Sequence, residues 1–223
     1  MMILAPTASS PLSLRFSRLF KARRRATPPP ATIPYDTLSE YEFFEGALAN
    51  IEPRTGVVPY DVVSPLWSDG ANKQRFIVLP EGQKVTFGAD ETWQFPDGTI
   101  IVKHFAFLRD EREPNGALQH IETRLLIRDS SVPEGFTAHT YIWNDAQTDA
   151  ALLETALTKT YEGEGEGGAT EKVDWYYPSR AQCMMCHTGA AGRVLGWPAV
   201  AKDSESGSHM ATLPPPPSPS VQP

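Results

Sequence analysis

Short alternating segments separated by turn residues limit the fold of this chain more than any other feature. Turns such as Pro80-Glu81-Gly82 and Pro96-Asp97-Gly98 divide segments rich in β-branched and aromatic residues, at 74–79, 84–87, 91–95, 99–107, 121–128, 137–143 and 172–177. Strands that recur about every 8–15 residues are typical of antiparallel sandwiches and barrels. We therefore predict a mainly β fold, an antiparallel β-sandwich or jelly-roll-like domain at 35–178.

A short helix is expected at each end of this β-rich part. Thr37 and Glu40 fit a capping box, and apolar residues follow at helical spacing, which predicts an N-terminal helix over 38–48. Near the C-terminus a small helical segment is expected to begin at Arg180, with 188–194 as its continuation. Glycines in that continuation weaken a helix.

Charge is unevenly distributed along the chain. The net charge is −7, yet residues 1–34 contain six basic and no acidic residues, so the remainder stands at −13. We predict that 1–34 is a disordered basic leader, with a targeting segment as the alternative, and that 201–223 is a disordered proline-rich tail. The acidic remainder argues against nucleic acid as a partner. No apolar run is long enough to form a transmembrane helix.

Both cysteines of the chain lie in one motif, Cys183-Met184-Met185-Cys186-His187. The pattern C-x-x-C-H is the attachment signature of c-type haem. Residues three apart in a helical turn share one face, so both thiols can add to the two vinyl groups of one haem. The next residue is then placed as the proximal iron ligand. We therefore predict one covalent haem c on the segment 179–200, held by Cys183, Cys186 and His187.

Three other roles are open to a C-x-x-C pair: half of a zinc site, a redox dithiol and a disulfide. A structural zinc site needs two further ligands, but the chain has no other cysteine and its remaining histidines show no paired spacing. A thioredoxin-like dithiol needs a βαβ context, which a β-rich chain does not offer. Haem attachment is therefore the preferred interpretation.

The second axial ligand can be narrowed by counting methionines and histidines. Met184 and Met185 lie inside the haem loop and cannot reach the distal side, which leaves Met210 in the tail. The other candidates are His104, His120, His139 and His209. An iron without a second protein ligand is the alternative. An open position favours binding of small ligands, whereas Met or His favours electron transfer.

The sequence around and before the motif resembles a family of bacterial c-type cytochromes described as dihaem. The matching pieces cover about 38–196 and are Leu38-Ser39-Glu40-Tyr41, Gly56-Val57-Val58-Pro59-Tyr60-Asp61, Ser64-Pro65-Leu66-Trp67-Ser68-Asp69, Lys73-Gln74-Arg75-Phe76, Phe95-Pro96-Asp97-Gly98-Thr99, Ile121-Glu122-Thr123-Arg124-Leu125-Leu126, Tyr141-Ile142-Trp143-Asn144-Asp145 and Tyr177-Pro178-Ser179-Arg180. The resemblance implies covalent haem on Cys183 and Cys186, His187 as axial ligand, and export from the cytoplasm.

Two departures separate the chain from that family. It has a single haem motif, so a second haem does not carry over, and after Leu195-Gly196 it continues as a polar tail instead of further folded chain. We therefore expect a C-terminally truncated member.

The leading hypothesis is a periplasmic or otherwise extracytoplasmic electron carrier, rather than an enzyme, with one haem c. Its expected partner is a redox protein, such as a dehydrogenase, with a basic surface that complements the acidic chain. The alternative is a β-sandwich binding or interaction module with a vestigial or sensory haem site. A third hypothesis is a haem or metal enzyme that uses His104, His120 or His139.

Two further groups have structural and functional interpretations. Ser68-Asp69-Gly70 with Lys73 and Arg75 forms a polar cluster that suits a turn, or a site for substrate or haem propionates. Four tryptophans are expected in the core or in the walls of a haem pocket rather than as a ligand platform: Trp67, Trp93, Trp143 and Trp175.

Overall fold

A computed structural model describes residues 33–62, 65–88 and 93–195. The chain is mainly β, with antiparallel sheets, a sandwich-like arrangement and one small C-terminal α-helix, so the predicted fold class is confirmed. The largest sheet has the strand order β1-β2-β5-β6-β7-β8. Its members are β1 Val57–Pro59, β2 Asn72–Val78, β5 Ile100–Leu108, β6 Leu118–Arg128, β7 Phe136–Trp143 and β8 Ala150–Leu152.

Two hairpins complete the β structure. A small one pairs β3 (Thr86–Phe87) with β4 (Trp93–Gln94), and a longer ribbon pairs β9 (Leu157–Glu164) with β10 (Thr170–Tyr177). Because the strands of the large sheet follow chain order around the β3–β4 excursion, its connectivity is a meander. The likeness to a jelly roll is therefore limited to the presence of two layers.

The N-terminal segment covers one face of the large sheet. The expected capping box is present, since the Thr37 amide donates to Glu40 Oε2 at 2.9 Å. The predicted helix over 38–48 is wrong in extent, because only a 3₁₀ turn forms, η1 (Leu38–Tyr41), followed later by η2 (Leu48–Asn50). Glu42 ends η1 in the left-handed region, at φ 52°. Extended backbone after it lets both Phe43 and Phe44 be buried, which a single helix face would not allow.

The core of this first face is aromatic and aliphatic. Side chains of η1, β2, β5, β6 and β7 meet there in one cluster, which we call the N-terminal cluster: Leu38, Tyr41, Phe43, Phe44, Ile51, Val57, Phe76, Val78, Ile100, Val102, Leu125, Ile127, Tyr141, Trp143 and Ala150. Strand residues that alternate with these point to the opposite face.

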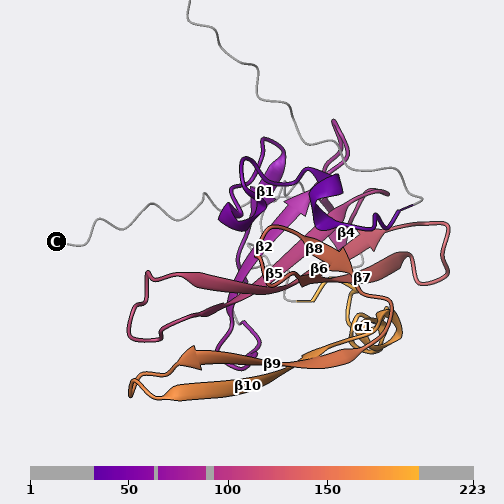
Figure 1. Cartoon of the computed structure of the whole chain (residues 1–223). Helices are drawn as coiled ribbons and strands as arrows, with labels where there is room; N and C mark the ends of the chain where they lie inside the picture. The colour runs from indigo at the N-terminus through magenta and orange to yellow at the C-terminus, as the bar shows by residue number, and fades with distance from the viewer. Residues whose placement is uncertain (1–32, 63–64, 89–92, 196–223) are drawn as a thin grey trace, which may run out of the picture.

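The opposite face is covered by the β9–β10 ribbon and by α1 (Arg180–Cys186), which contacts β7. Figure 1 shows the ribbon running along the large sheet and α1 beside it. Two clusters fill this layer. One lies under α1 and the β3–β4 hairpin and includes Ile77, Ile101, Leu126 and Ala138. The other lies under the ribbon and includes Phe105, Ile121, Trp175 and Tyr177.

The turns follow the sequence closely. Ser68 and Ala71 close a turn through a 2.8 Å backbone hydrogen bond, and its central residues Asp69 and Gly70 both have positive φ, as a type I′ turn requires. The structural interpretation of this polar cluster is therefore confirmed. Trp143 and Trp175 are buried, but Trp67 is 77% exposed, so its expected place in the core is wrong.

The outer segments fall partly or wholly outside the described residues. This applies to most of the predicted leader at 1–34, to the end of the haem segment at 179–200, and to the whole predicted tail at 201–223. None of the helices in the described part of the chain is long and apolar enough to cross a membrane.

Candidate haem-attachment site

The cysteine motif lies on α1 and in the turn that follows it. Ser179 caps the helix with Gln182, whose Oε1 accepts from the Ser179 amide at 2.9 Å. This capping box holds the start of a helix of only seven residues. Cys183 and Cys186 are three apart on it and therefore share one side. Neither forms a disulfide.

The two thiols differ in their surroundings. Cys183 is half-buried and packs against the cluster under α1, whereas Cys186 is exposed. Burial raises the pKa of the Cys183 thiol, with smaller opposing effects from Arg124 and from a hydrogen bond with Thr140. The Thr140 hydroxyl also donates to the Pro178 carbonyl at 3.2 Å, which ties β7 to the residue before the helix cap. The large sheet thus fixes the position of Cys183.

His187 is held in one ring orientation by the turn after α1. Its Nδ1 lies 2.6 Å from the carbonyl oxygen of Arg193. A carbonyl only accepts, so Nδ1 carries the proton of the neutral ring and Nε2 keeps its lone pair. Burial is the largest cause of the lowered pKa of His187, and the charges of Lys103 and Arg124 lower it further. The neutral ring is the form that binds a metal.

A tight loop closes this arrangement. The Arg193 amide donates to the Thr188 carbonyl at 3.0 Å, and Arg193 Nη1 donates to the His187 carbonyl at 3.0 Å. The expected helical continuation over 188–194 is wrong, because α1 ends at Cys186 and Gly192 and Arg193 both adopt positive φ. The loop returns the Arg193 carbonyl to the histidine, which a continuing helix would not do. The motif predicted His187, but no sequence pattern pointed to Arg193 as its partner.

The histidines proposed as distal ligands are not brought to this site. His104 and His120 lie with Trp143 on the face covered by the N-terminal segment, with ring centroids 5.5 and 4.6 Å from that indole. His104 Nε2 and His120 Nδ1 are 2.8 Å apart, and His104 Nδ1 bonds to Thr123 at 2.9 Å. The sheet itself separates this pair from α1.

A β-bulge explains how the two histidines meet. Phe105 pairs with Glu122 but Ala106 pairs with His120, so Ile121 is the extra residue on β6. The bulge turns His120 to the same face as His104, which a regular alternation would not do. The pKa of His104 is lowered to about 3, mainly by burial and in smaller part by the neighbouring His120. Sequence spacing alone cannot reveal this contact, since it depends on the register of two strands.

His139 lies on that same face. It precedes Thr140, which points toward α1, so alternation along β7 turns His139 away from the haem-attachment segment. Its Nε2 bonds to Thr137 Oγ1 at 3.0 Å, while its buried Nδ1 has no hydrogen-bond partner among the described residues. Burial lowers the pKa of His139 to about 4. Met210 and His209 lie outside the described residues.

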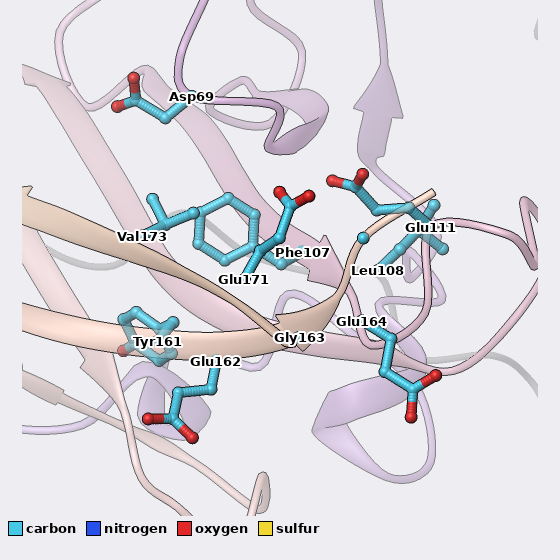
Figure 2. Close-up of a pocket in the computed structure, with 11 residues that line it drawn as sticks. Asp69, Phe107, Leu108, Glu111, Tyr161, Glu162, Gly163, Glu164, Glu171 and Val173 are labelled. Atoms are coloured by element: carbon cyan, nitrogen blue, oxygen red, sulfur yellow. The ribbon is translucent and has the colours of Figure 1, made fainter. Parts of the chain in front are cut away.

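Two cavities lie away from the cysteine motif. The one in Figure 2 has a volume of about 40 Å³ and carboxylates of the ribbon, including Glu162, Glu164 and Glu171, around its rim. The other, of about 420 Å³, opens between β2, β5 and the loop before β6, beside His104. No group of three or more His, Cys, Asp or Glu suited to a metal ion occurs in the described part of the chain.

No family model, curated protein or solved structure matches this chain. Function is therefore inferred from the cysteine motif and from the geometry around His187.

Proposed function

We propose that this chain carries one covalent haem c on α1 and transfers electrons. The observation that carries the proposal is the hydrogen bond from His187 Nδ1–H to the Arg193 carbonyl. A ligating histidine in proteins characteristically donates its other ring N–H to a carboxylate, a carbonyl or water, which orients the ring and raises its basicity. Here that second-nitrogen contact is already in place next to the two free thiols.

Each residue of the motif has a defined task in this proposal. The S–H bonds of Cys183 and Cys186 would add across the two vinyl groups, forming two thioethers with no other product. His187 would bind the iron through Nε2, and the loop at 188–193 would hold its ring in place. The haem, when bound, supplies a one-electron iron couple whose potential depends on its axial ligands and burial.

The proposal extends to location and partner. Haem c is attached outside the cytoplasm, so the proposed site of action is the periplasm or another extracytoplasmic compartment. The acidic chain, made more acidic by haem propionates, would favour a redox partner with a basic surface. A dehydrogenase that passes single electrons to the haem is the proposed class of partner, and the chain itself would act as a carrier rather than an enzyme.

Expression in a host that matures c-type cytochromes tests the proposal directly. We expect the purified wild-type chain to gain the mass of one haem and to give the reduced α-band of a two-thioether haem. Cys186→Ala should retain one thioether at most, which shifts that band. Met185→Ala is the matched control, because Met185 lies between the cysteines and is 75% exposed.

A colourless wild-type product with both thiols reactive would refute the proposal. Equal loss of haem from Met185→Ala and Cys186→Ala would assign that loss to folding rather than to thioether chemistry, and the wild-type mass and α-band would then decide the proposal.

A binding module is the second candidate, and one observation favours it. Leu66 and Trp67 are 74% and 77% exposed in the loop before β2, an unusual display of two large apolar side chains. The test is a Cys183→Ser/Cys186→Ser double variant. Cooperative unfolding together with a partner interaction that Trp67→Ala abolishes would favour this function, whereas loss of every interaction along with the haem would favour electron transfer.

A further inference from the structure

Three basic side chains form a row across the face of the large sheet that carries α1. Arg75 on β2 pairs directly with Lys103 on β5, and Lys103 pairs directly with Arg124 on β6. Thr140 on β7, which contacts Cys183, is the next residue in the same row. The strand register thus places three cations side by side, and the row that they form ends at Thr140, next to the cysteine motif.

Two side chains of the row, those of Lys103 and Arg124, also lie close together in space. Lys103 Nζ and the Arg124 guanidinium both lie over the ring of Phe105, 4.9 and 4.8 Å from its centroid. The charges of Lys103 and Arg124 both act on His187. The row therefore lies between the ribbon cluster and the attachment segment, within electrostatic reach of the proposed iron ligand.

The charge of the row is only partly balanced. Arg75, which is 7% exposed, pairs with Asp61 at 2.9 Å. Arg124 pairs with the fully buried Glu122 at 2.6 Å. Among the described residues, no carboxylate forms a salt bridge with Lys103. Like charges that face each other directly across strands are destabilising. The three cations of the row have two carboxylate partners, so one positive charge is left without a salt bridge among the described residues.

The surroundings of Lys103 agree with that deficit. The pKa of Lys103 is lowered to about 8, mainly by burial and in smaller part by the charges of Arg124, Arg75 and Lys73, while Glu122 opposes them. Lys103 is half-buried rather than fully enclosed. Arginine and lysine in one row offer several N–H donors to carboxylate oxygens.

We propose that Arg75, Lys103 and Arg124 form a carboxylate-binding row that receives the haem propionates and fixes the orientation of the haem on α1. This inference rests on the proposed haem attachment and adds the residues that recognise the acidic edge of the macrocycle. Lys103 is the central residue, because it brings the uncompensated charge. Its role is positioning and electrostatic.

The test compares Lys103→Gln and Lys103→Arg with the wild type, all isolated with covalent haem. Lys84→Gln is the matched control, since Lys84 is exposed and lies outside the row. Lys103→Gln should lower the midpoint potential, because a positive charge near the haem stabilises the reduced state. It should also shift the propionate bending bands in the resonance Raman spectrum. Lys103→Arg should restore both, and Lys84→Gln should change neither.

The outcomes separate this inference from the function it rests on. Absence of haem from the wild type overturns both. Haem present with unchanged propionate bands and potential in Lys103→Gln overturns the inference alone. Unchanged propionate bands, together with thermal stabilisation by inorganic phosphate that Lys103→Gln abolishes, would also overturn it, because the row would then bind a free anion.

Discussion

The two faces of the large sheet treat polar groups in opposite ways. Under the N-terminal segment, the buried polar side chains are neutral, and most of them bond to one another, with His139 Nδ1 as the exception among the described residues. Tyr41 and Tyr141 share a hydrogen bond of 2.8 Å between their hydroxyls, and His104 bonds to both His120 and Thr123. On the face that carries α1 and the ribbon, the polar groups are charged, from Arg75 across to Arg124.

The two faces differ in the charge of their buried polar groups. A neutral hydrogen-bonded network stabilises and orders the core of a fold. Charges at the centre of a face are costly unless partners satisfy them, and the row around Lys103 is only partly satisfied. The first face therefore contributes a neutral core, and the second carries the charged groups on which the proposed site depends.

The largest expected effect on the free energy of unfolding comes from a substitution in the core under the N-terminal segment. Trp143 is 2% exposed, and its indole N–H donates to Thr123 at 3.0 Å. Trp143→Ala should lower the free energy of unfolding by about 3–5 kcal/mol, because it leaves a cavity in the core and removes the indole's hydrogen bond to Thr123. Urea unfolding measures this loss. The 77% exposed Trp67 supplies the control, and equal effects from Trp67→Ala and Trp143→Ala would contradict the assignment of the core.

A smaller effect is expected from the charged face. Glu122 is fully buried and accepts from Arg124 at 2.6 and 2.9 Å and from the Trp175 indole at 2.9 Å. Glu122→Gln should cost about 2–3 kcal/mol, because it weakens charged hydrogen bonds in the interior. Urea unfolding again measures it. Glu162→Gln removes an exposed carboxylate from the ribbon and should leave the urea midpoint unchanged. A Glu122→Gln variant as stable as that control would show that the buried pair carries no stability.

The third expected effect is that stability depends on pH through the buried histidines under the N-terminal segment. Folding lowers the pKa of His104 to about 3 and of His139 to about 4, mainly through burial. The unfolded chain therefore binds more protons below its ordinary histidine pKa of about 6.5. Stability is fully present above that pH and falls as the pH drops toward 4, by up to about 1.4 kcal/mol per pH unit for each histidine.

His139→Leu isolates one part of that dependence. It removes the unpartnered Nδ1 and one hydrogen bond to Thr137, so stability at pH 7 should change by less than about 1 kcal/mol. The loss of stability between pH 6.5 and 4 should become shallower. Thermal unfolding across this range measures the slope, and identical slopes in the two proteins would contradict a neutral buried His139.

Several elements could be read from local sequence because their causes are local. Alternation of apolar and polar residues identified the strands from β2 to β7, and the segment 172–177 corresponds to most of β10. Thr37 and Glu40 correctly located the start of η1. Its length was not predictable in the same way, because the burial of Phe43 and Phe44 against the sheet outweighs helical spacing.

The sequence by itself determined a mainly β chain and a C-x-x-C-H motif, because strand periodicity and the spacing of two thiols are properties of neighbouring residues. Only the tertiary structure decided that His187 is oriented by the Arg193 carbonyl, that His104, His120 and His139 lie across the sheet from it, and that three basic residues align beside the motif. These relations depend on a loop closure, a bulge and a strand register. Each of them is set by packing between segments far apart in the chain, which no local pattern encodes.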